Sequence, residues 1–220
     1  MNLMNRFVSK KEKLQIHHTD SLLVDKITDR TTSWFPSVPR EYVVICIGTD
    51  RSTGDALGPL AGSHLADMKL RHLHLYGTLT NPVHATNIVD YIQHIHYWHK
   101  NPYIIAVDAS LGKPASVGTI MTSMGAVSPG AALNKKLPSI GDIHMTGVVN
   151  ISGFMEHATL QNTRLALVVQ MAQKIAAILE TIDQKLTYTR SVPTVLTQHS
   201  FNYQQDIYWQ SNQKADNHPL

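Results

Sequence analysis

Cysteine is almost absent from this sequence, and so are the signals that mark a secreted or membrane-bound chain. The 220 residues contain one cysteine, Cys46, which excludes an internal disulfide framework and a cysteine-based zinc site. No uninterrupted apolar run approaches the roughly 20 residues that span a bilayer, and residues 1–6 have no apolar signal core. We therefore expect a cytoplasmic protein without membrane contact, in which Cys46 is a small buried hydrophobic residue.

Charge is also scarce, and it is not concentrated. Charged residues make up 16% of the chain and the formal net charge is +3, with the lysines and arginines scattered. A nucleic-acid-binding surface normally shows a basic patch or stripe, so we expect no nucleic-acid partner. Hydrophobic residues make up 43% of the chain, which is enough for one globular domain with a real core.

Two nucleotide-binding motifs are missing from the most structured stretch of the sequence. Gly48, Gly54 and Gly58 do not have the G-x-G-x-x-G spacing of dinucleotide-binding folds, and no G-K-[ST] follows as in a phosphate-binding loop. Asp55 would also repel a phosphate placed at the start of the following helix. We expect no nucleotide cofactor.

The same stretch, residues 42–60, predicts a strand, a turn and a helix. The apolar run 42–47 is typical of a strand buried on both faces of a parallel sheet. A polar turn with two glycines follows, and Pro59 suits the first turn of a helix. Asp55 lies between turn and helix, at the sheet edge where open α/β folds bind their ligands.

Further strands and helices alternate along the chain, which predicts an α/β fold of three layers: a mostly parallel sheet with helices on both faces. We expect a polar N-terminal extension over residues 1–34, one domain over 35–186, and a poorly ordered tail over 187–220. The expected strands are 42–47, 74–79, 103–107, 118–122 and 144–151, and the expected helices are 59–68, 86–98 and one long helix over 154–186.

Asp55 and Asp108 are the candidate catalytic residues. Each follows a buried strand of parallel type, so neighbouring strands would bring both acids to one mouth of the sheet. Two carboxyl groups that share a site cannot both ionise easily, which provides one acid and one base for hydrolysis. The alternative is structural: Asp55 as a helix cap and Asp108 as a turn residue.

The other chemically interesting side chains have weaker support. Asp50 is interpreted as a turn residue, and no G-x-S-x-G elbow supports a serine nucleophile. Histidine is abundant, but the set on the second helix lacks the H-E-x-x-H pattern, so we interpret its members as surface residues. His144, near the start of the last strand, is a candidate base or ligand, although a structural role is the more common one. The helical set is His94, His96 and His99.

Three separated segments, 47–59, 106–112 and 147–155, resemble the YyaC family of sporulation proteins. That family is related to the spore germination protease, and both resemble the hydrogenase maturation proteases. The resemblance implies a phosphorylase/hydrolase-like α/β sandwich, with Asp55 and Asp108 at the positions of the catalytic acids proposed for the germination protease. The maturation proteases add a metal-binding histidine in a Ser-x-His motif, for which the segment 151–153 offers no counterpart, so we expect no metal or other cofactor.

These observations lead to one main hypothesis and one alternative. The main hypothesis is a peptidase-like hydrolase of the sporulating cell or forespore, in which Asp55 and Asp108 activate water against an amide bond of a protein or peptide substrate. The alternative is a non-catalytic protein of spore formation that binds a peptide or partner on the same fold. The sequence leaves the oligomeric state open, and a homo-oligomer is compatible with it.

Overall fold

A six-stranded sheet with the order β1-β5-β6-β4-β2-β3 organises the fold in this computed structural model. The structure describes residues 13–129, 137–153 and 155–189. The pairs β2–β3, β2–β4 and β4–β6 are parallel, and β1–β5 and β5–β6 are antiparallel. The strands are β1 (Lys13–His17), β2 (Tyr42–Cys46), β3 (Leu73–Tyr76), β4 (Tyr103–Gly112), β5 (Thr119–Met124) and β6 (Ile143–Ile151).

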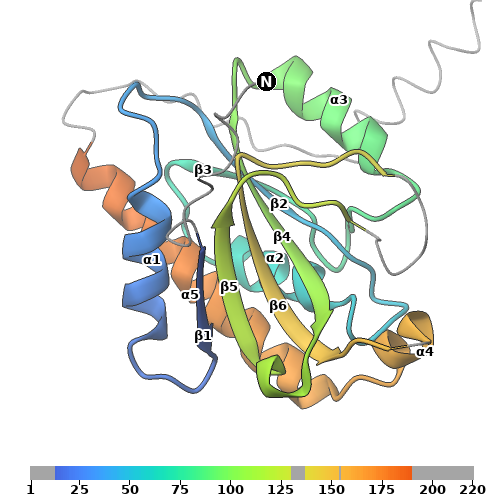
Figure 1. Ribbon diagram of the computed structural model, residues 1–220. Coiled ribbons are helices and arrows are strands. Elements are labelled where there is room, and N and C mark those ends of the chain that lie inside the picture. Colours follow the sequence, from blue (N-terminus) through green and yellow to red (C-terminus); the bar gives the residue numbers. More distant parts are fainter. Residues whose placement is uncertain (1–12, 130–136, 154, 190–220) are drawn as a thin grey trace, which may run out of the picture. The chain divides into compact units, whose positions relative to one another are not determined.

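Helices cover both faces of this sheet, which confirms the expected α/β class (Figure 1). On one face, α1 (Leu23–Thr32), α2 (Leu57–Ala66) and α5 (Leu165–Thr189) share a hydrophobic core with Val44 and Cys46 of β2. On the other face, α3 (Ile88–Trp98) contacts Tyr76 of β3 through its Tyr91 and His94 rings. All five residues of β2 are buried, as a strand covered on both sides requires. Two short helices complete the fold, η1 (Pro114–Ser116) and α4 (Glu156–Gln161).

The expected N-terminal boundary is wrong. Residues 13–32, which the sequence analysis assigned to a polar extension, form β1 and α1 of the same domain. β1 completes the sheet beside β5, and Leu23 and Ile27 of α1 are fully buried in the core. The hydroxyls of Thr31 and Thr122 lie 3.0 Å apart and join α1 to β5. Short elements with few apolar residues show little periodicity, so their packing partners, far along the chain, decide their structure.

The expected single C-terminal helix is two helices. α4 ends at Gln161 and α5 begins at Leu165. The Thr163 hydroxyl accepts a hydrogen bond from Asn150 Nδ2 at 3.3 Å, and the Leu160 carbonyl accepts one from Gly54 N at 2.8 Å. These contacts with β6 and with the β2–α2 turn bend the chain between the helices. Residues 154 and 190–220 lie outside the described residues, as does most of the tail expected over 187–220.

The apolar composition of α5 is explained by its position in the core of the domain. By length and composition, its Leu165–Leu186 stretch could cross a membrane, with a mean hydropathy of 1.5. One such helix is weak evidence for a membrane span, because the core helix of a soluble protein can have the same length and composition. In this structure its apolar side belongs to the core of the domain, through residues that include Val168, Met171, Ala172, Ile175, Ile178, Leu179 and Ile182. Packing inside the domain therefore accounts for the composition of α5.

Candidate functional site

The turn after β2 and the first turn of α2 are packed tightly enough to require glycine at one position each. Gly48 has a φ of 147°, and a Cβ there would lie 1.9 Å from the carbonyl oxygen of Asp55. That carbonyl accepts a hydrogen bond from Thr49 N at 3.1 Å. A Cβ on Gly58 would lie 2.1 Å from the Ile47 carbonyl oxygen. The start of α2 is thus pressed against the end of β2, which fixes the backbone of Asp55.

Asp108 lies where β2 has ended and β4 continues. The last residue pair of β2 with β4 is Cys46 with Val107, so Asp108 is the first residue of β4 beyond that pairing. β4 itself runs to Gly112, further than the expected end at residue 107, because β6 remains paired beside it. From Asp108 onward, no residue of β2 pairs with β4. The arrows of β4 and β6 point toward α4, so the mouth of the sheet, meaning the edge formed by the carboxyl ends of these strands, lies at that end (Figure 1).

The two predicted acids interact electrostatically in this mouth. Burial raises the pKa of Asp108 from 3.8 to about 8, the Ala109 N–H lowers it through a 2.8 Å hydrogen bond, and the Asp55 carboxylate raises it further. Asp108 therefore carries a proton at neutral pH. Burial also raises the pKa of Asp55, while the Ser52 hydroxyl and the His157 ring lower it. The structure thus brings both acids to one site and makes them unequal.

α4 contributes a histidine that the sequence analysis missed. His157 is exposed on α4, and its positive form favours the ionised Asp55 carboxylate. The hydrogen bond from Gly54 N to the Leu160 carbonyl, 2.8 Å long, holds α4 against the β2–α2 turn. A Ser-x-His motif would have placed a histidine two residues after Ser152, whereas His157 lies on a separate helix further along the chain. Only the packing of α4 reveals it.

Two buried hydroxyl groups accompany the acids. Thr146 is the residue of β6 that pairs with Asp108, and Ser52 lies in the same turn as Asp55. Each is 4% exposed, and neither hydroxyl has a hydrogen-bond partner of good geometry among the described residues. The Ser52 hydroxyl is close enough to lower the pKa of Asp55, although this contact falls short of a well-formed hydrogen bond. Unpaired buried hydroxyls are uncommon in proteins, and a functional role or a bound water is among their explanations.

The remaining candidates from the sequence have structural contacts. His144 Nδ1 lies 2.8 Å from the Gly125 carbonyl oxygen and joins β6 to the end of β5. Two serines that lie outside any G-x-S-x-G elbow, Ser110 and Ser152, donate to the carbonyls of Gly147 and Gly112, respectively. Asp50 is exposed in its turn, as predicted.

The single cysteine is a buried hydrophobic residue, as predicted. Cys46 is fully buried in the core, and burial raises the pKa of its thiol to about 12. The thiolate is the reactive form of cysteine, so this side chain is chemically inert.

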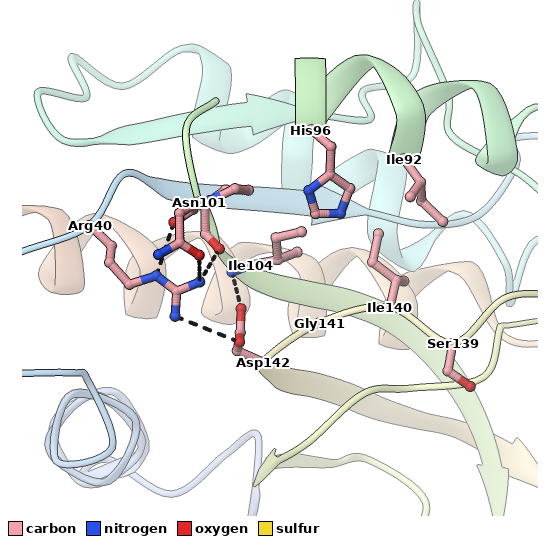
Figure 2. Close-up of a pocket in the computed structure, with 10 residues that line it drawn as sticks. Arg40, Ile92, His96, Asn101, Ile104, Ser139, Ile140, Gly141 and Asp142 are labelled. Atoms are coloured by element: carbon pink, nitrogen blue, oxygen red, sulfur yellow. Dashed lines mark hydrogen bonds and ion pairs between the residues drawn. The ribbon is translucent and has the colours of Figure 1, made fainter. Parts of the chain in front are cut away.

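A pocket of about 250 Å³ lies at the other end of the strands, where residues precede β2, β4 and β6 (Figure 2). Arg40 donates to the Asn101 side chain and to the carbonyls of Asn101 and Pro102, and it lies 3.9 Å from Asp142. Asp142 in turn accepts a hydrogen bond from Ile104 N at 2.8 Å. These polar groups bond to one another and connect the starts of the strands. Asp55 and Asp108 do not line this pocket.

A second group of titratable side chains gathers beside β3. His99 Nδ1 lies 2.7 Å from Glu41 Oε2, and the His74 and His99 rings are 4.5 Å apart between centroids. Burial and the neighbouring His99 lower the pKa of His74, and Glu41 partly offsets this. The interpretation of His99 as a surface residue is wrong, because it is 7% exposed. The residue was missed because its partners, Glu41 and Tyr76, are distant in sequence.

Comparison with known proteins supports the similarity to YyaC. The chain is 48% identical over 187 residues to the uncharacterized protein YyaC of Bacillus subtilis (strain 168), which covers 84% of this chain and 91% of that protein. Among solved structures, a [NiFe] hydrogenase maturation protease, HycI from Thermococcus kodakarensis KOD1, aligns with a TM-score of 0.47 and 16% identity, over 67% of this chain and 95% of that one. The family model described as "Protein of unknown function (DUF1256)" matches residues 8–178. The chain therefore belongs to the DUF1256 family.

Proposed function

We propose that this protein is a peptidase-like hydrolase that cleaves an amide bond with Asp55 and Asp108. The observation that carries the proposal is the inequality of the two carboxyl groups: the pKa of Asp108 is raised to about 8, mainly by burial and further by the charge of Asp55. Pairs of titratable groups whose surroundings separate their pKa values are typical of acid–base catalysis. A helix cap or a turn aspartate would need no such arrangement.

The inequality assigns a role to each acid. Asp55, whose pKa is raised by burial and lowered by the Ser52 hydroxyl and the His157 ring, takes a proton from a water molecule as the water oxygen attacks the substrate carbonyl. Asp108, which is protonated at neutral pH, donates its proton to the leaving nitrogen as the C–N bond breaks. The proton on Asp55 then returns to Asp108 through solvent, which restores the starting state. Since the proton transfers lie at the reacting atoms, loss of either acid removes a large part of the rate.

The substrate is proposed to be a protein or peptide. Apolar side chains flank the helix that carries His157: Ile151 is 48% exposed, Met155 71% and Leu165 57%. Exposed apolar side chains beside a polar site suit the side chains of a bound peptide. The same surface also supports the second candidate function, in which the chain binds a peptide without cleaving it. The resemblance to sporulation proteins suggests that the substrate or partner belongs to the sporulating cell or forespore.

Cleavage of a peptide library, with new termini detected by mass spectrometry, tests the proposal. Wild-type protein should cut a subset of peptides, and Asp55→Asn and Asp108→Asn should each lower the rate by about a hundredfold or more. Asp50→Asn is the matched control, because Asp50 is an exposed acid of the same turn. Cleavage that survives in both variants would exclude the acid pair. If wild-type protein binds peptides and never cuts them, the non-catalytic function replaces hydrolysis.

A further inference from the structure

Three potential metal ligands converge at the end of the sheet opposite to the acid pair. Glu41 immediately precedes β2, His74 lies in β3, and His99 is the C-cap residue of α3. Glu41 accepts a backbone hydrogen bond from Tyr103 N at 2.7 Å, and His74 is paired with Val43 of β2. His99 N donates to the last turn of α3 at 2.9 Å. Rigid backbone therefore positions all three side chains.

The ligand atoms are already gathered. One carboxylate oxygen of Glu41 and one ring nitrogen each of His74 and His99 all lie within 4.8 Å of one another. Ligands bound to zinc at about 2.0–2.2 Å in a tetrahedron are roughly 3.3–3.5 Å apart, so small side-chain rotations would complete the geometry. Glu41 and His74 are exposed and free to make them, while His99 is buried and held in place.

A further contact fixes the ring of His99. Tyr76 Oη lies 2.8 Å from His99 Nε2, on the side of the ring away from Glu41. If a metal replaces the proton between Nδ1 and Glu41, the Nε2–H can donate to the tyrosine oxygen. Metal-binding histidines usually donate their other ring N–H to such a partner, which sets the tautomer and the ring orientation.

We propose that Glu41, His74 and His99 bind one divalent transition-metal ion of the Zn²⁺ type. Two imidazoles and one carboxylate suit zinc, whereas calcium and magnesium prefer oxygen ligands alone. The exposure of Glu41 and His74 leaves the fourth position to water. The ion would join β2, β3 and the end of α3. This site is separate from the acid pair, whose chemistry does not depend on it.

Metal binding by the full chain, purified without a histidine tag, tests the proposal. Isothermal titration with Zn²⁺ should give one site per chain with a micromolar or tighter dissociation constant, and Co²⁺ should give the intense visible absorption of a four-coordinate site. His74→Ala and Glu41→Gln should weaken binding by at least about a hundredfold, and Tyr76→Phe by roughly 10–100-fold. His96→Ala is the matched control, an exposed α3 histidine outside the group, and it should bind as wild type does.

His74→Ala and Glu41→Gln change exposed ligands, so they avoid the risk of misfolding that a substitution of the buried His99 carries. Zn²⁺ should also raise the melting temperature of wild-type protein and of His96→Ala, and it should not raise that of His74→Ala. Binding that is weaker than millimolar, or unaffected by His74→Ala and Glu41→Gln, would overturn the proposal. Stoichiometric metal lost with Asp55→Asn and retained in His74→Ala would place the ion at the acid pair and equally refute this site.

Discussion

Replacement of Asp108 by asparagine should stabilise the protein, and the gain should grow with pH. In the folded state the pKa of Asp108 is about 8 instead of 3.8. Between these two values the folded chain holds a proton that the unfolded chain releases, so the free energy of unfolding falls as pH rises. The destabilisation caused by Asp108 is therefore absent below a pH of 3.8 and complete above a pH of about 8. The asparagine side chain cannot ionise, keeps an oxygen for the Ala109 N–H and removes the repulsion with Asp55.

The pKa difference sets the size of the effect. At about 1.4 kcal/mol for each pH unit between the two values, the upper limit above pH 8 is about 6 kcal/mol. Asp108 is partly exposed, and solvent and neighbouring groups will relax around the charge, so we expect a measured gain of about 1–3 kcal/mol. At about pH 4 wild type and Asp108→Asn should be equally stable.

Urea unfolding followed by circular dichroism, repeated between about pH 4 and pH 9, measures this difference. The stability of wild type should fall across this range relative to that of Asp108→Asn, while peptide cleavage is lost in the variant. Asp55→Asn should give a smaller gain, because it removes the repulsion but not the burial of Asp108. A variant that is less stable than wild type at every pH, or a difference that does not change with pH, would refute the raised pKa and favour a structural aspartate.

Other parts of the structure can be tested in the same way. Asp183→Asn should lower the free energy of unfolding by about 1–3 kcal/mol in urea melts, because this buried carboxylate accepts hydrogen bonds from the backbone of Arg71, His72 and Leu73; unchanged stability would contradict this. Gly58→Ala should lower the melting temperature, at a cost of about 1–3 kcal/mol, because its Cβ would lie 2.1 Å from the Ile47 carbonyl oxygen; a melting temperature equal to that of wild type would show that α2 can shift. Removal of residues 190–220 should leave a soluble domain with the melting temperature of the full chain, since the core cluster extends from Leu23 to Leu186; an insoluble product would place the tail in the core.

The sequence by itself determined the elements whose signal is local. The apolar run 42–47 and the run 103–107 predicted the neighbouring interior strands β2 and β4, and both runs are buried as expected, because a strand covered on both faces needs apolar residues throughout. The helical spacing in 86–98 similarly predicted α3. The positions of Asp55 and Asp108 at the ends of neighbouring strands followed from the same reasoning, since parallel strands bring their carboxyl ends to one edge.

Tertiary structure decided whatever depends on partners distant in the chain. β1 and α1 are short, and their place in the domain comes from β5 and α5. The break before α5 comes from contacts with Asn150 and Gly54. Burial and a neighbouring charge shift the pKa of Asp108, and neither is encoded by the residues next to it. His157 beside Asp55, and His99 between Glu41 and Tyr76, likewise meet their partners only when separate elements pack.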